Sequence, residues 1–236
     1  MGMTANLQST LALLDAARHQ RGEPVTVVFS SSVAVYGSDP ALPMPDVVSE
    51  ATLPTPQSSY GAQKFICEQL VADYTRKGFV DGRVARLMTV AVRPGKPNAA
   101  ASGFLSGIIR EPLSKIATVC PVRPELSVAL ESPRRTVEGL LRVAQAERGD
   151  DAGNLRGRIA VNLPALTVTV AEMLETLRRI AGDAVADLVF VESDPAIEAI
   201  VGSWPSRFDN SRAAALGLTG DASFADVVEQ YRDDNL

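Results

Sequence analysis

The sequence predicts an α/β fold built on a parallel β-sheet, and three observations support this prediction. Residues 25–29 (VTVVF) form a short β-branched run, which is typical of a strand buried on both faces. Helical patterns lie on either side of it, at residues 6–17 and 60–74, and a second strand pattern follows at residues 83–90. The order helix, strand, helix, strand describes right-handed crossovers between parallel strands.

Local signals set the ends of the first elements. Cationic and glycine residues at 21–22 predict the end of the first helix. Residues 38–59 are rich in proline and serine and predict a surface loop long enough to suggest a function. Ser58 or Ser59 can cap the next helix, which we expect to stop near residues 77–78.

The second half of the chain continues the mixed pattern. A proline- and glycine-rich loop at residues 92–98 leads into an apolar helical run. Thr169 followed by Glu172 forms a capping box. We therefore expect a soft boundary near residue 165, between a sheet-building part at residues 1–164, with excursions into the second part, and mainly a smaller cap at residues 165–236. The further elements expected here are helices from 104, 132, 169 and 224, extended chain at 116–128, and strands near 159–163 and 188–191.

Composition excludes several classes of function. The chain has 236 residues, 46% of them hydrophobic, and a net charge of −5 without a basic block, so nucleic acid and anionic membranes are not expected partners. Cys67, Cys120 and His19 are too few for a transition-metal site, and Cys67 is expected in the core. There is neither an apolar run of membrane-spanning length nor a signal peptide, so we expect a cytoplasmic setting.

Two groups of residues are candidates for chemistry. Tyr60 and Lys64 are one helical turn apart and project from one face, where a cation favours the phenolate and proton transfer. The alternative is an ordinary exposed pair. Residues 30–32 are serines at the carboxyl end of the first strand, where α/β proteins place ligand chemistry. The alternative here is that the serines cap the backbone.

The order and spacing of these residues resemble the extended short-chain dehydrogenase/reductase family. Residues 31–37 (SSVAVYG) and 60–64 (YGAQK) match its serine strand and its Tyr-x-x-x-Lys helix, and Ser32 and Tyr60 are 28 residues apart. Residues 6–10 and 209–218 are similar to its leading helix and its carboxyl-terminal pattern. The resemblance covers nearly the whole chain.

The resemblance implies roles for individual residues. Tyr60 would be the general base toward a substrate hydroxyl, and Ser32 would hydrogen-bond the reacting oxygen. Lys64 would lower the pKa of the phenol and bind the ribose of the nicotinamide cofactor. Asn6 would assist the reaction through a water molecule or a backbone kink; the alternative is that it only caps a helix. Met88 and Thr89 would pack the nicotinamide, or be plain strand residues.

Within the family, the loop at residues 92–98 with its continuation to residue 113 is similar to dehydrogenases of four-carbon sugar acids. The implied reaction is hydride transfer from the 2-hydroxyl carbon of such an acid to NAD, with Asn98 and Ser102 as substrate residues. Residues 88–89 and 132–136 depart from the motifs of nucleotide-sugar members. A sugar epimerase or dehydratase and a degenerate, non-catalytic member remain the alternatives.

One part of the family pattern is absent from this sequence. A Gly-x-Gly-x-x-Gly turn, which would cradle the cofactor pyrophosphate, is not found. The expected fold is therefore a Rossmann-like doubly wound parallel sheet lacking its first strands, with a small α+β cap, from a truncated or degenerate chain. We expect residues 25–29 to form a sheet edge and NAD to bind weakly to this chain. The resemblance leaves NADP open and suggests a homodimer.

Overall fold

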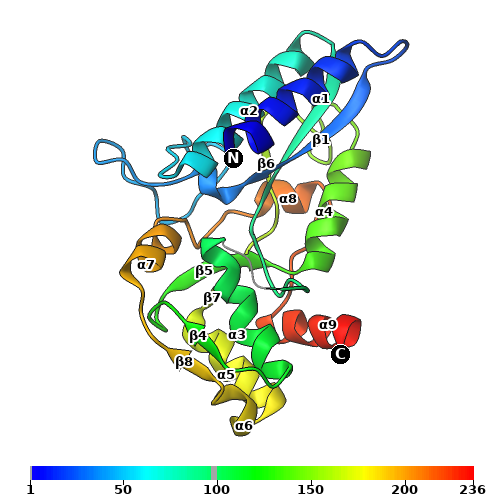
Figure 1. Cartoon of the computed structure of the whole chain (residues 1–236). Coiled ribbons are helices and arrows are strands. Elements are labelled where there is room, and N and C mark those ends of the chain that lie inside the picture. The colour runs from blue at the N-terminus through cyan, green and yellow to red at the C-terminus, as the bar shows by residue number, and fades with distance from the viewer. Residues whose placement is uncertain (1, 97–99) are drawn as a thin grey trace. The chain divides into compact units, whose positions relative to one another are not determined.

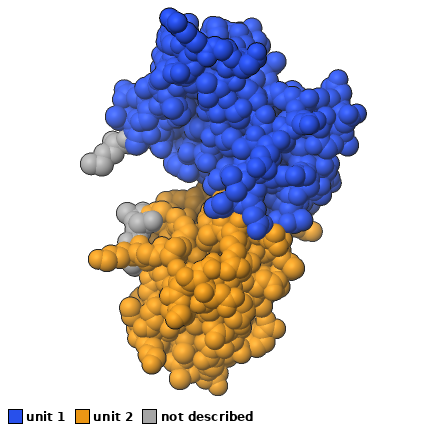
Figure 2. Space-filling model, turned by 90° about the vertical axis from the view of Figure 1, so that its right-hand side faces the viewer, with its two compact units in different colours: residues 1–88, 137–164, 209–219 blue, residues 89–136, 165–208, 220–236 orange. Residues whose placement is uncertain are grey.

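The computed structural model describes residues 2–96 and 100–236, which divide into two compact units (Figure 2). The first unit comprises residues 1–88, 137–164 and 209–219, and the second comprises the rest. The expected division at residues 164 and 165 falls at one of the points where the chain passes between units. In the structure, residues 89–136 contribute strands to the second unit, and residues 209–219 contribute a helix to the first.

A parallel sheet of order β1-β2-β6 forms the centre of the first unit. Its strands are β1 (Val25–Ser32), β2 (Val80–Leu87) and β6 (Val161–Asn162). The register runs from Val25 opposite Val80 to Ser32 opposite Leu87, so the three serines lie at the carboxyl end of β1. The predicted parallel α/β architecture is confirmed.

Helices cover both faces of this sheet (Figure 1). The π-helix Met3–Gln8, α1 (Ser9–Arg18) and α2 (Ser59–Arg76) lie on one face, and α4 (Pro133–Gln145) and α8 (Ser211–Ala215) lie on the other. Val84 packs with Leu14 of α1 and Val71 of α2, whereas its neighbour Ala85 packs with Val143 of α4. Because successive strand side chains point to opposite faces, one strand serves two apolar layers.

The burial of β1 differs from the sequence-based expectation. Residues 25–29 were expected to be buried on both faces, but Val25 is 39% exposed and Val27 to Phe29 are only partly buried. In the described sheet β1 pairs with β2 alone, so its other edge is open, and residues 25–29 form the expected sheet edge. The open edge explains the incomplete burial.

The second unit combines two small sheets with helices. Strands β3 (Thr89–Val90) and β5 (Ser127–Glu131) are parallel, and β7 (Leu166–Thr169) is antiparallel to β5. A further parallel pair joins β4 (Thr118–Cys120) to β8 (Val189–Val191). The remaining elements are the 3₁₀ turn Ala101–Gly103, α3 (Phe104–Leu113), α5 (Val170–Ala181), α6 (Asp183–Ala186), α7 (Pro195–Gly202) and α9 (Phe224–Asn235).

One apolar cluster, to which α3, α5 and α9 all contribute, forms the core of the second unit. The predicted capping box is present: the Thr169 hydroxyl accepts from the Glu172 amide, and the Glu172 carboxylate accepts from the Thr169 amide. Both cysteines are buried thiols. Within residues 2–96 and 100–236, His, Cys, Asp and Glu form no group of three suited to a metal ion. No helix in that part is long and apolar enough to cross a membrane.

Candidate active site

The start of α2 brings Tyr60 to the end of β1. The Ser58 hydroxyl caps the helix by accepting from the Gly61 amide at 3.0 Å, as the sequence predicted. A Cβ at Gly61 would lie only 1.9 Å from the carbonyl oxygen of Ala34, in the 3₁₀ turn Val33–Val35. Glycine thus allows the helix to approach the turn that directly follows Ser32.

Ser32 has a hydroxyl with a proton still available for donation. Its oxygen accepts a hydrogen bond from the Ala34 amide at 3.2 Å, so the serine does cap the backbone. A hydroxyl can accept from one group and donate to another. Ser32 can therefore cap the 3₁₀ turn and also donate to an oxygen placed beside Tyr60.

The electrostatics of Tyr60 differ from the simple expectation of a lowered pKa. Partial burial raises the pKa of the Tyr60 phenol, and the adjacent Ser32 hydroxyl opposes this rise. The Lys64 ammonium donates to the Ser30 carbonyl at 2.8 Å, and it lies 4.8 Å from the Phe29 ring centroid and 5.8 Å from the Tyr60 ring centroid. Burial lowers the pKa of Lys64. In the unliganded protein the cation is thus held by the strand rather than by the phenol.

The residues expected around a nicotinamide cofactor are distributed over both units. Asn6 lies inside the π-helix Met3–Gln8, and its side-chain amide donates to the Gln63 side chain of α2 at 2.8 Å. It is not a helix cap; it lies at a local distortion of the first helix. Met88 is buried directly after β2, and Thr89 begins β3 of the second unit.

Of the two expected substrate residues, the structure describes one. Ser102 lies in the 3₁₀ turn Ala101–Gly103 of the second unit. Asn98 falls outside the residues that the structure describes. The described candidate site therefore comprises Ser32, Tyr60 and Lys64, all within the first unit.

These three side chains fit the nicotinamide end of a dinucleotide. Within the described chain, Lys64 uses one of its three donors on Ser30, which leaves two for the neighbouring hydroxyls of a ribose. Tyr60 is 45% exposed, so its hydroxyl is accessible to a substrate. A serine at the carboxyl end of a parallel strand beside a Tyr-x-x-x-Lys helix is the arrangement typical of short-chain dehydrogenases/reductases.

Sequence reasoning missed a buried polar cluster directly beneath the site. Glu68 of α2 and Arg86 of β2 are each 3% exposed and form a salt bridge of 2.6 Å. The available signals were an arginine within an apolar strand run and a glutamate one helical turn beyond Lys64. Neither signal distinguishes a buried ion pair from two solvated charges.

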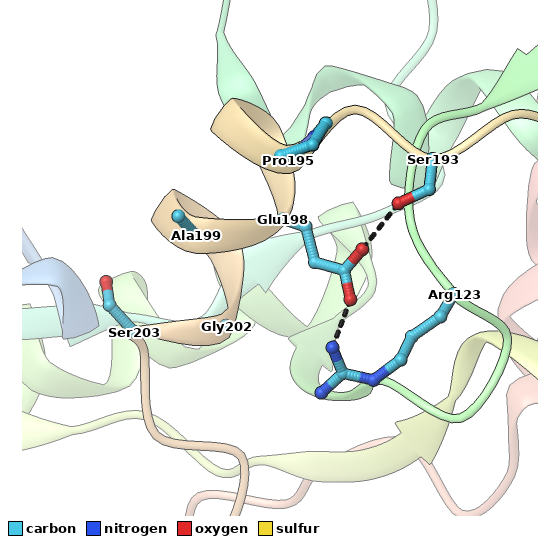
Figure 3. A pocket seen from close by; sticks show the side chains of 7 residues that line it. All are labelled: Arg123, Ser193, Pro195, Glu198, Ala199, Gly202 and Ser203. Carbon is cyan, nitrogen blue, oxygen red and sulfur yellow. Dashed lines mark hydrogen bonds and ion pairs between the residues drawn. The ribbon is translucent and has the colours of Figure 1, made fainter.

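A separate recess of about 470 Å³ lies in the second unit, between α7 and the segment that precedes β5 (Figure 3). Glu198 lies in the middle of its lining, paired with Arg123 and accepting from the Ser193 hydroxyl at 2.6 Å. Because the charges of Arg123 and Glu198 satisfy each other, this recess offers no unpaired group for acid–base chemistry.

Comparisons with known proteins agree with the fold and the site. A model of the NAD dependent epimerase/dehydratase family matches residues 2–122. D-erythronate dehydrogenase from Cupriavidus necator is 52% identical over 99% of this chain and 69% of its own length, and that from Haemophilus influenzae is 42% identical over 98% and 70%. A nucleoside-diphosphate-sugar epimerase structure from Agrobacterium tumefaciens has a TM-score of 0.88 at 38% identity, covering 99% of this chain and 67% of that one.

The chain belongs to the NAD dependent epimerase/dehydratase family, which confirms the predicted short-chain dehydrogenase/reductase type. An L-threonine dehydrogenase structure from Cupriavidus necator, with a TM-score of 0.82 at 20% identity, supports the same fold; it covers 99% of this chain and 80% of that one. The family and the dehydrogenase relatives support an enzyme with a nicotinamide cofactor and a small-molecule substrate.

Proposed function

We propose that this protein is an NAD-dependent dehydrogenase that oxidises the 2-hydroxyl carbon of a small sugar acid, with D-erythronate as the candidate substrate. The main support is the 52% identity, over 99% of the chain, to a relative named D-erythronate dehydrogenase. The candidate acid–base residues give the proposal a chemical basis, since Ser32, Tyr60 and Lys64 lie together at the carboxyl end of β1.

Each of the three residues has a defined task in this proposal. Tyr60 accepts the proton of the substrate hydroxyl as general base. Ser32 donates a hydrogen bond to the reacting oxygen, and Lys64 binds ribose hydroxyls and adds positive charge near the phenol. Bound NAD supplies the hydride acceptor.

The remaining assignments are part of the same proposal. Asn6, Met88 and Thr89 would contribute to the nicotinamide pocket, and Asn98 and Ser102 would contact the substrate. NAD is proposed over NADP because the matching family model is described as NAD dependent. A homodimer and a cytoplasmic location stay predictions.

The test is to mix the chain with D-erythronate and NAD or NADP and to follow reduced nicotinamide by its absorbance. Because this sequence has no Gly-x-Gly-x-x-Gly turn, we expect weak cofactor binding and would use NAD concentrations well above the usual range. Reduction of NAD that depends on D-erythronate and is lost in Tyr60→Phe would support the proposal. No reduction at any NAD concentration, with a folded chain, would contradict it.

The relative named nucleoside-diphosphate-sugar epimerase makes a second function worth testing in the same assay. An epimerase or dehydratase uses NAD without net reduction, so conversion of a nucleotide sugar with no accumulated NADH would favour it. Turnover of neither substrate class would favour a non-catalytic role.

A further inference from the structure

Helix α2 is tied to the end of β1 by residues at four-residue intervals. Tyr60 lies beside the Ser32 hydroxyl, Lys64 donates to the Ser30 carbonyl, and Glu68 accepts from the Ser31 hydroxyl at 2.5 Å. Residues four apart share one helix face, so Glu68 extends the face that carries the proposed catalytic pair. Three consecutive residues of β1 are thus each matched by one residue of α2.

Arg86 fixes the carboxylate of Glu68 in a bidentate grip. Its Nε donates to Oε1 at 2.9 Å and its Nη2 donates to Oε2 at 2.6 Å. Arg86 is also the strand partner of Ser31 in the β1–β2 register. Glu68, Arg86 and Ser31 therefore form a closed triangle between one helix and two strands.

The cluster extends beyond this triangle. The Arg86 Nη1 donates to the Tyr36 hydroxyl, which in turn donates to the Asn162 side chain of β6 at 3.0 Å and lies 3.1 Å from the Ser49 carbonyl. Tyr36 lies a few residues after Ser32, at the end of the 3₁₀ turn. The segment containing Ser32 is therefore held on both sides, at Ser31 and at Tyr36.

The energetics of buried ion pairs suggest what this arrangement does. The cost of removing two charges from water largely offsets their attraction, so an apolar pair of similar volume would stabilise the fold as well or better. A fork-shaped guanidinium–carboxylate contact adds direction, which an apolar pair lacks. The buried pair is better explained by positioning than by stability.

We propose that Glu68, oriented by Arg86, is a positioning residue that holds Ser31 and thereby sets the Ser32 hydroxyl beside Tyr60. This inference rests on the proposed function, in which Ser32 and Tyr60 share the reacting oxygen. Glu68 touches neither substrate nor cofactor in this scheme and acts through the strand.

The test uses Ser31→Ala in the full chain, because this variant removes the tie to Glu68 and leaves the buried ion pair intact. The matched control is Thr75→Val, which removes the Gly82 amide to Thr75 hydroxyl bond (3.0 Å) between α2 and β2. The probe is the pKa of Tyr60, measured by NMR with ¹³C in the tyrosine rings and assigned with Tyr60→Phe. This measurement does not require activity.

We expect Ser31→Ala to raise the Tyr60 pKa, since the phenolate loses the neighbouring Ser32 hydroxyl. Thr75→Val should leave the Tyr60 pKa unchanged while lowering the melting temperature about as much as Ser31→Ala does. If Ser31→Ala also leaves that pKa unchanged, the Ser31–Glu68 hydrogen bond has only a structural role and the proposal is overturned.

Kinetics separate this inference from the proposed function. If the wild-type chain reduces NAD with D-erythronate, Ser31→Ala should lower kcat about 10-fold with little change in KM. Glu68→Gln replaces one of the two oxygens that accept from Arg86 with a donor, so it should lower kcat at least as much as Ser31→Ala does. If the wild-type chain is inactive, the proposed function fails, and the Tyr60 titration still decides the positioning role.

Discussion

The two ends of helix α2 contact the same sheet in different ways. At its start, Tyr60, Lys64 and Glu68 meet the strand end through polar contacts. In its last turns, Val71 and Tyr74 enter an apolar cluster with residues of β2. One end has directional contacts suited to proton transfer, and the other has close packing suited to stability. One helix can thus hold a site through polar contacts in one part and pack the apolar core with its last turns.

The largest expected effect is that of Tyr60→Phe at the polar end. Losing a general base typically costs about 10²- to 10⁴-fold, so we expect kcat with D-erythronate to fall within that range. Stability should change little because Tyr60 is 45% exposed. Tyr74→Phe at the other end is the control and should retain activity. Similar activities in Tyr60→Phe and Tyr74→Phe would show that the two ends of α2 do not differ in their contribution to catalysis.

Gly61→Ala tests the polar end of α2 without removing a polar group, because it changes only how closely the helix approaches the turn after Ser32. The added Cβ would lie 1.9 Å from the Ala34 carbonyl oxygen, so the helix start must move away from the turn after Ser32. A displacement of that kind costs about 100-fold in kcat/KM, with a destabilisation of about 1–3 kcal/mol. Ala72→Gly in the same helix should cost about 1 kcal/mol with no loss of rate. Unchanged kinetics in Gly61→Ala would show that the close approach is dispensable.

Val71→Ala tests the apolar end. Val71 is 1% exposed, and removing two buried carbons should lower the free energy of unfolding by about 2 kcal/mol. The urea midpoint followed by circular dichroism measures this change. We expect kcat to stay within about 2-fold, since the cluster is separate from the polar contacts. A large loss of kcat at constant stability would mean that the apolar end also positions the site.

The smallest expected effect concerns the pH dependence of stability. The Tyr74 hydroxyl donates to the Asp15 carboxylate at 2.6 Å, and this bond, together with burial, raises the pKa of Tyr74 above its ordinary value. A raised pKa means that the folded protein holds the proton more tightly. The contribution is complete below pH 10 and is lost as the pH rises through the folded pKa.

Tyr74→Phe should therefore flatten the loss of stability above about pH 10, where the unfolded chain releases the tyrosine proton and the folded protein still holds it. Burial also raises the pKa values of Tyr36, Tyr60 and Tyr231, so the slope should decrease rather than vanish. Urea midpoints of the two proteins across this pH range provide the measurement. An identical slope would argue against the Tyr74–Asp15 bond.

Much of the fold was predictable because its signals are local. Ser58 caps α2, the helix ends at Lys77, and Thr169 opens α5, all as the sequence patterns indicated. Excursions between the two parts were expected, but the segments that cross were not predicted, because they depend on pairings such as β3 with β5 that link distant segments. No window of the sequence contains that information.

The candidate site was predictable in part for the same reason. Ser32, Tyr60 and Lys64 follow a spacing that can be read directly from the chain. The role of Glu68 depends on the β1–β2 register, which places Arg86 opposite Ser31, and on burial of both charges. The raised pKa of Tyr60 likewise follows from its burial, which the spacing does not show.

The open side of β1 has a consequence for hydrogen exchange. In the described sheet, β1 bonds only to β2, so alternate backbone amides of residues 25–32 point toward a partner strand and the others do not. Exchange rates along this strand should therefore alternate between slow and fast. Any molecule that pairs with the open edge would slow exchange only at the amides that point away from β2. Hydrogen exchange along β1 would therefore show whether its open edge is occupied.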